Sequence, residues 1–426
     1  MNWKTQVPRL AATLMCCTCL ATALAQSPAS PVVPEFGATV PAPLALVSGW
    51  NTPLLQAFNA TLSTSGFTSQ MGDELKASVP FMLPDYYSLL ERDLMGGAPV
   101  PAAYQGMDPA AMRARLARES VIMLRNHHQI IPIHKKFKQT IAVMGPMANR
   151  SLPGWSGAAG PTLLELIRAQ VEQGVEVRHF EGCDPVEDSR SSNALISAAV
   201  PASRQVDLTV LCLGTDDLAL IPASGGKLPV PQEKLLRALY QATPNIILIV
   251  VAPRPVSLDY ASTRIPGILV AWSPGADGAA ALTEALFGAY NPGGRLPCDI
   301  PRTPDTAPSV HNPDPVFQVY TTPGPLYPAG FGLSLTRFGY SALKFTKASN
   351  AGELSVTITN EGDLAGEEVV QLYREDEGKP RLVAFERIRL EPGASRVVVF
   401  ETAVPSKSRL FVGGSSQDAR LSLITP

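Results

Sequence analysis

The chain has 426 residues, of which 45% are hydrophobic and 17% charged, and its formal net charge is −2. This length predicts two or three domains, and the hydrophobic content is enough for a sizeable core. The sequence has neither a basic stripe nor an acidic tail, so we expect no nucleic-acid partner. Its 40 prolines and 33 glycines favour many loops over a coiled coil.

The first 25 residues have the pattern of a secretory signal peptide. Lys4 and Arg9 form a positive segment, an apolar run from Leu10 to Leu24 follows, and residues 23–25 read Ala-Leu-Ala, a small-x-small cleavage site. The apolar run is too short to span a bilayer well. We therefore expect a secreted or periplasmic protein, with no membrane attachment after cleavage.

The cysteines and histidines predict neither a disulfide framework nor a metal site. Outside the signal peptide only three cysteines remain, and they are widely spaced: Cys183, Cys212 and Cys298. Three buried thiols are favoured over a single disulfide. Three histidines surround Pro132 without nearby acidic or cysteine ligands: His127, His128 and His134. We expect no metal and no cofactor.

Between residues 140 and 287, strand and helix patterns alternate. Short apolar runs predict strands at residues 141–144, 175–180, 208–213, 246–251 and 267–271. Helical patterns occupy residues 163–173, 193–200, 231–241 and 279–287. This alternation predicts a mostly parallel sheet flanked by helices, with ligands at the carboxyl ends of its strands. A preceding helix, capped by Asp108, is predicted to continue to Asn126.

From Phe338 onward, apolar and polar residues alternate with period two. Strands are expected at residues 354–360, 368–373, 396–400 and 409–412, with turns at residues 361–363 and 391–393. The pattern predicts a small antiparallel sandwich of about seven strands. Residues 302–336, rich in Pro, Asp and Thr in their first part, have the composition of a linker.

One stretch, residues 272–297, reads W-S-P-G-A-D-G-A-A-A-L-T-E-A-L-F-G-A-Y-N-P-G-G-R-L-P. It predicts a helix that ends at Gly288 and then a tight turn. The stretch resembles the signature of the C-terminal α/β sandwich domain of glycoside hydrolase family 3, the β-glucosidase-like enzymes. Residues 119–126, 141–148 and 327–334 resemble three further motifs of that family, in the family's order.

The resemblance implies a division of the chain into five parts. They are a signal peptide (1–25), a linker with a remnant of the family's (β/α)8 barrel (26–109), the α/β sandwich (110–301), a linker (302–336) and a fibronectin type III-like domain (337–426).

The family's catalytic carboxylates have no counterpart at the matching positions. A retaining glycosidase needs two carboxyl groups, one as nucleophile and one as acid/base. The run Leu44–Trp50 resembles the barrel strand that carries the nucleophilic Asp, but this position is Gly49. The loop that holds the acid/base Glu contains no Glu here, and the Glu position falls on Leu220.

Four other residues are candidates for contact with a substrate. Asp216 and Asp217 could form a substitute carboxylate pair, although a solvated turn is the favoured interpretation. Trp155 resembles the family's loop tryptophan that faces the barrel, and it could stack on a sugar or belong to the core. Asp184 resembles the family's Gly-Cys-Asp after a strand, although a loop contact is the commoner role.

Three functional hypotheses follow, in order of preference. The first is an exported family 3 relative that is catalytically inactive alone and binds carbohydrate or acts as a scaffold. The second is one half of a split β-glucosidase whose barrel is a separate partner chain, docked on an apolar face. The third is an active O-glycosyl hydrolase with a relocated carboxylate pair.

Overall fold

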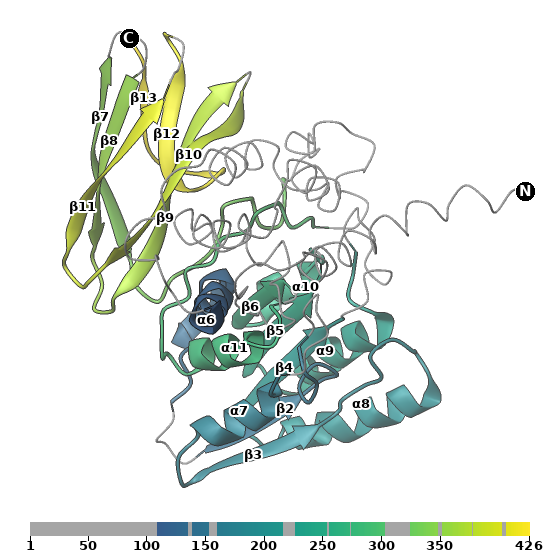
Figure 1. The fold of residues 1–426 in the computed structure, drawn as a ribbon. Coiled ribbons are helices and arrows are strands. Elements are labelled where there is room, and N and C mark those ends of the chain that lie inside the picture. The colour runs from purple at the N-terminus through teal and green to yellow at the C-terminus, as the bar shows by residue number, and fades with distance from the viewer. Residues whose placement is uncertain are drawn as a thin grey trace, which may run out of the picture.

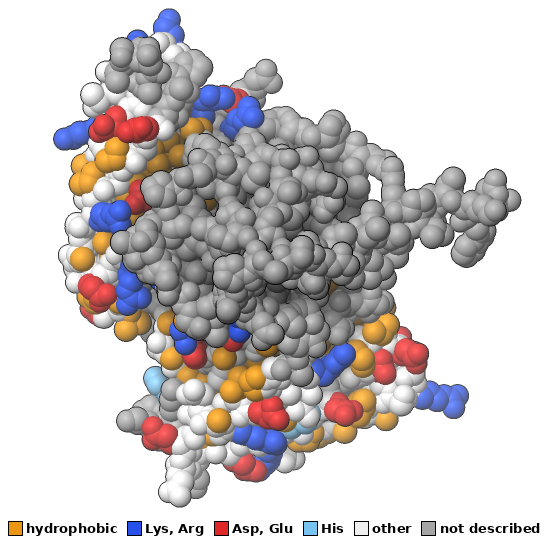
Figure 2. Space-filling model, viewed as in Figure 1, with side chains coloured by type: hydrophobic (Ala, Val, Ile, Leu, Met, Phe, Trp, Pro, Cys, Tyr) orange, Lys and Arg blue, Asp and Glu red, His pale blue; other side chains and the backbone are white. Residues whose placement is uncertain are grey.

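The structure, a computed structural model, describes residues 109–134, 139–152, 160–215, 226–253, 255–272, 274–302, 324–347, 352–376, 378–402 and 406–426. Within these residues an α/β unit precedes a β-sandwich, and Figure 1 shows the sandwich beside the end of the α/β unit that carries α6 and α11. In the view of Figure 2, acidic and basic side chains are interspersed over the described surface.

A six-stranded sheet forms the centre of the α/β unit. Its strands are β1 (Ile122–Asn126), β2 (Gln139–Met144), β3 (Val175–Phe180), β4 (Leu208–Gly214), β5 (Ile246–Ala252) and β6 (Gly267–Trp272). The order is β1-β6-β5-β4-β2-β3, with β2 to β6 parallel. Every residue of β4, β5 and β6 is buried, as expected for strands covered on both faces. The predicted fold class is confirmed.

Helices cover both faces of this sheet (Figure 1). One side carries α7 (Leu163–Gln170) and α11 (Gly278–Leu286), with α6 (Pro109–Ser120) beside α11. The other carries α8 (Arg190–Ser203), α9 (Val230–Ala242) and α10 (Asp259–Arg264), the last of which the sequence pattern did not indicate. Helix α7 begins with a capping box, in which Thr162 and Glu165 each accept a hydrogen bond from the other's backbone N–H.

The prediction of one continuous helix to Asn126 is wrong. Helix α6 ends at Ser120, and β1 follows as an edge strand antiparallel to β6. All four residues from Val121 to Leu124 are buried. An amphipathic helix buries one face, whereas an extended strand between two layers buries consecutive side chains. Residues 122–126 therefore form a strand because β6 offers a free edge with which they can pair.

The C-terminal unit is an antiparallel sandwich of seven described strands, in agreement with the prediction. They are β7 (Phe338–Lys347), β8 (Gly352–Asn360), β9 (Gly366–Asp376), β10 (Lys379–Leu390), β11 (Ser395–Thr402), β12 (Arg409–Ser415) and β13 (Asp418–Ile424). The two sheets have the orders β10-β9-β12-β13 and β11-β8-β7. Buried residues alternate with less buried ones along β8, which is the pattern of a strand with one face on a core.

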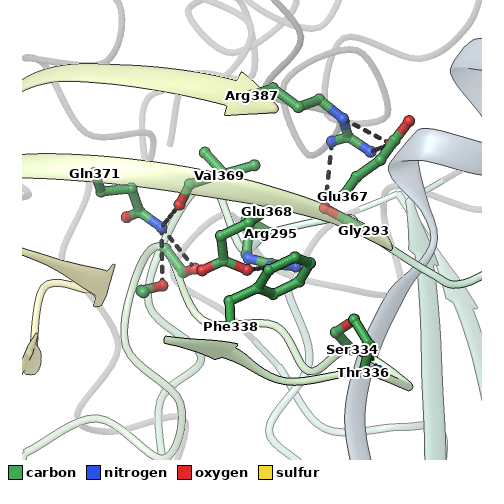
Figure 3. A network of polar contacts seen from close by, with 12 residues as sticks. Gly293, Arg295, Ser334, Thr336, Phe338, Glu367, Glu368, Val369, Gln371 and Arg387 are labelled. Atoms are coloured by element: carbon green, nitrogen blue, oxygen red, sulfur yellow. Dashed lines mark hydrogen bonds and ion pairs between the residues drawn. The ribbon is translucent and has the colours of Figure 1, made fainter. Parts of the chain in front are cut away.

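Buried charges and apolar packing join the two units. The Arg295 guanidinium donates through Nη2 to Glu368 Oε2 at 2.6 Å (Figure 3). Tyr340 donates its hydroxyl proton to the other carboxylate oxygen at 2.8 Å. Beside them, one hydrophobic cluster contains Leu296 from the α/β side and Val369 from β9. The interface is therefore part of the folded core.

A second ionic contact crosses the same interface. Arg387 on β10 donates through Nε and Nη2 to Glu367 Oε2, at 2.9 and 2.5 Å, and through Nη1 to the Gly293 carbonyl (Figure 3). Its Nε also lies 3.8 Å from a carboxylate oxygen of Glu119 in α6, which is only 5% exposed. Glu119 is thus a buried ion-pair residue between the units.

Candidate functional site

Two glycines mark the carboxyl edge of the sheet, where parallel α/β folds bind their ligands. Gly145 follows β2 with φ +101°, and a Cβ placed there would lie 2.3 Å from the Cys212 carbonyl oxygen. Gly214 ends β4 with φ +134°, and its Cβ would lie 1.7 Å from the Val251 carbonyl oxygen. Only glycine fits both the backbone conformation and the space. The loops after β2 and β4 therefore leave the sheet in tight contact with neighbouring strands.

A buried glutamine connects two loops of this edge. Gln232 is 0% exposed, and its Oε1 accepts a hydrogen bond from the Gly214 N–H at 2.7 Å. Its Nε2 donates to the carbonyls of Gly214 and Pro185, each at 2.7 Å. The side chain thus holds the end of β4 against the loop that follows β3. The sequence analysis missed this role, because the Gln sits 18 residues from its main partner.

Asp184 lies in that same loop after β3 and is half-buried. Its Oδ1 accepts hydrogen bonds from the backbone N–H groups of Glu187, at 2.6 Å, and Val186, at 2.8 Å. These two bonds hold the pKa of the carboxyl below its usual value, so the group is ionised at neutral pH. Asp184 therefore shapes the loop, and a contact between its Oδ2 and a substrate stays a prediction.

The remaining predicted site residues lie outside the described part of the chain: Gly49, Trp155, Asp216, Asp217 and Leu220. The loops that contain residues 155 and 216–220 follow β2 and β4, which are neighbours in the sheet. Thr215, the last described residue before the second loop, is buried and donates its N–H to the Val251 carbonyl at 3.0 Å. Both loops thus start from the same edge of the sheet.

The three cysteines of the described chain are free and buried, as favoured from the sequence. Burial raises the pKa of the Cys183 thiol to about 12 and also raises the pKa values of Cys212 and Cys298. Such thiols are poor nucleophiles. Within the described ranges, no three His, Cys, Asp or Glu side chains form a group that could hold a metal ion. Among the helices described, none has the length and apolar character that a membrane crossing requires.

Comparison with known families identifies the α/β unit. The model of the glycosyl hydrolase family 3 C-terminal domain matches residues 121–335, half of the chain. The chain belongs to glycosyl hydrolase family 3. Its match begins in the buried segment that leads into β1 and ends just before the sandwich, so the family domain includes the edge strand.

Relatives of this family 3 chain carry glycosidase names. A β-xylosidase of Formosa agariphila is 31% identical, over 67% of this chain and 43% of its own length. A periplasmic β-glucosidase of Salmonella typhimurium is 30% identical, over 71% of this chain and 48% of its own length. The solved structure of a β-glucosidase of Erythrobacter marinus superposes with a TM-score of 0.64 at 26% identity, covering 86% of this chain and 57% of that one. The chain thus spans about half the length of the curated relatives it matches.

Proposed function

We propose that this family 3 chain binds carbohydrate at the carboxyl edge of its sheet and does not by itself hydrolyse glycosidic bonds. The sequence of the loop after β4 carries this proposal. Between Thr215 and Pro229 there is no Glu, and the only carboxylates are Asp216 and Asp217. The family resemblance assigns the acid/base to this loop, and the nucleophile to the position of Gly49.

The chemistry of glycoside hydrolysis explains why a chain without the acid/base Glu and the nucleophilic Asp should not hydrolyse a glycosidic bond. A retaining glycosidase holds two carboxyl groups roughly 5–5.5 Å apart, one to attack the anomeric carbon and one to protonate the leaving oxygen. A glycine cannot attack, and a leucine cannot transfer a proton. A site without both groups retains only the contacts that bind the sugar.

The relatives supply the class of ligand to test. Their names refer to β-glucosidase and β-xylosidase activity, which makes neutral β-linked glucose and xylose units the first candidates. The tight strand ends and the Gln232 bridge provide a fixed base for the loops that would contact them. We also propose that the protein is exported, on the basis of the signal-peptide pattern in residues 1–25.

The test is to measure hydrolysis and binding with the same purified chain. Aryl β-D-glucosides and β-D-xylosides report turnover, and calorimetric titration with gluco- and xylo-oligosaccharides reports binding. The variants are Asp216→Asn combined with Asp217→Asn, and Asp363→Asn as a matched control in an exposed turn of the sandwich. We expect saturable binding and no turnover from the native chain.

Two results would overturn the proposal in different ways. Turnover that the double Asn variant abolishes and Asp363→Asn retains would support a relocated carboxylate pair. Failure of a folded chain to bind any oligosaccharide would remove the binding function. Isolation of a barrel-containing chain with this protein, together with turnover by the complex, would support the split-enzyme alternative.

A further inference from the structure

A cleft of about 840 Å³ lies where the two units meet. Helix α6 and the end of α11 form one wall, and the start of β9 and the end of β10 form the other. Figure 1 shows α6 and α11 side by side at this end of the sheet. The cleft shares no lining residue with the loops after β2, β3 and β4, so it is separate from the site proposed above. Its volume is within the range of small-molecule sites, which often occur between domains.

Interactions across the interface hold the walls of this cleft in place. Asn291 accepts a hydrogen bond from the Leu335 N–H at 2.7 Å and donates to the Ala365 carbonyl at 3.3 Å. Arg387 donates through Nε and Nη2 to one oxygen of Glu367, Oε2, and this contact fixes the wall formed by β9 and β10. The cleft is therefore set by the domain arrangement and requires no rearrangement to receive a ligand.

The arginines of the lining are paired with carboxylates but keep spare donors. Four arginines and three glutamates line the cleft, and the fourth arginine pairs with a glutamate just outside the lining. Arg118 donates hydrogen bonds from Nε and Nη2 to the Glu284 carboxylate, at 2.5 and 3.0 Å. Its Nη1 donates to no described residue. Its side chain is 46% exposed. Arg389 is 63% exposed, and its described partner is Glu391 at 3.5 Å. Guanidinium donors thus remain available on both walls.

The same cleft offers apolar surface and hydrogen-bond acceptors. Leu364, in the turn before β9, is 49% exposed, and Leu335, which also lines the cleft, is half-buried. Glu284, 24% exposed, can accept hydrogen bonds from ligand hydroxyl groups. A pyranose ring has an apolar C–H face and a polar rim, which match these two kinds of surface.

We propose that the cleft binds a sugar unit that carries a carboxylate, such as a hexuronate. The leucines contact the ring face, Glu284 accepts from a hydroxyl group, and the free donors of Arg118 and Arg389 bind the carboxylate. Arginine is suited to this task because its planar donors match the geometry of a carboxylate. A neutral sugar satisfies the hydroxyl contacts and gives the spare guanidinium N–H groups no charged acceptor.

The experiment titrates the full chain with sodium D-glucuronate and with D-glucose by calorimetry. We expect glucuronate to bind at least about tenfold more tightly than glucose, because a charge-assisted hydrogen bond is about twice as strong as a neutral one. Arg118→Gln and Arg389→Gln should each reduce this preference. The matched control is Arg178→Gln on β3, because Arg178 pairs with Glu176 through the same two nitrogens, at 2.8 and 3.0 Å, outside the cleft.

Each outcome decides the proposal. Equal affinity for the two sugars, or no saturable binding of glucuronate, would overturn it. If Arg178→Gln reduces the preference for glucuronate as much as Arg118→Gln does, the effect is a non-specific ionic one, and this result would also overturn the proposal. Melting temperatures equal to that of the native chain exclude misfolding as the cause of a reduced preference. Neutral oligosaccharide binding at the carboxyl edge is a separate measurement and can fail or succeed independently.

Discussion

Arg295 and Glu368 form an ion pair buried between the two units, with Nη2 and Oε2 2.6 Å apart and both side chains at most 3% exposed. The pair joins the loop after α11 to strand β9. Two charges removed from water in this way depend on each other, because neither can recover its hydration in the folded chain.

Replacement of one member of this buried pair should therefore lower the free energy of unfolding much more than replacement of one member of a surface pair. We expect Arg295→Met to lower the free energy of unfolding by about 3–5 kcal/mol, because Glu368 stays buried without its counter-charge. Arg409→Met, which breaks the pair with Glu375 whose side chains are 55% and 32% exposed, should cost less than about 1 kcal/mol. Chemical denaturation of both variants measures the difference, and equal losses would contradict the buried role.

Acid should weaken the contact between Glu367 and Arg387. Burial by itself raises the pKa of the Glu367 carboxyl and is the largest single influence. The charge and hydrogen bonds of Arg387, together with the charges of Arg115 and Arg389, outweigh burial and hold that pKa below its ordinary value. A carboxyl with a lowered folded-state pKa stabilises the fold above the unfolded pKa of about 4.3, and this stability is lost as the pH falls through the folded value.

We therefore expect the unfolding free energy of the native chain to fall more steeply below about pH 4 than that of Glu367→Gln, which has no proton to gain there. Urea denaturation across this pH range provides the measurement. Glu391→Gln, at an exposed position, should keep the native slope. If the unfolding free energy of Glu367→Gln falls with pH as steeply as that of the native chain, the Glu367 carboxyl does not contribute to the loss of stability in acid.

The Gln232 bridge gives a third prediction. Replacement by leucine keeps similar bulk but leaves the buried N–H and carbonyl of Gly214 and the partly buried carbonyl of Pro185 without this partner. We expect Gln232→Leu to cost at least about 2 kcal/mol of unfolding free energy. Gln241→Leu, at an exposed position near the end of the same helix, should have little effect. If the two variants unfold at the same denaturant concentration, the bridge has no energetic role.

Two glycines with similar backbone angles separate steric from conformational effects. Gly174 has φ +103° with no atom within 4 Å of an added Cβ, whereas Gly214 has φ +134° and a carbonyl oxygen at 1.7 Å. Gly174→Ala should lower the free energy of unfolding by about 1–2 kcal/mol, the usual penalty for an L-residue at positive φ. Gly214→Ala should lower it several times more and reduce the yield of soluble protein. Comparable melting temperatures would argue against the close approach of β4 and β5.

Much of the architecture follows from local patterns in the chain. The runs at residues 208–213 and 246–251 are almost wholly apolar, with Thr209 the one exception, because both faces of their strands are covered, and this signal depends only on neighbouring residues. The alternation along residues 354–360 identifies a strand with one buried face in the same way. The motif at residues 272–297, together with three further motifs in the family's order, also resembled the family that the comparisons established.

The sequence pattern predicted the wrong element where a strand far away in the chain provides the hydrogen-bonding partner. Residues 122–126 continue a helical pattern, yet they extend as β1 because β6 offers an open edge to pair with. The candidate site shows the same limit, since the role of Gln232 depends on carbonyls 18 and 47 residues away. Periodicity reports the faces of an element and contains no information about which distant atoms those faces meet.

The sequence by itself therefore determined the two kinds of sheet and the absence of a Glu between Thr215 and Pro229. Only the tertiary structure decided which charges pair across the interface, because Arg295 and Glu368 are 73 residues apart in the chain. It also decided where unpaired guanidinium donors face a cleft. The physical reason is that burial and charge pairing are properties of the assembled core, whereas strand and helix patterns arise from adjacent residues.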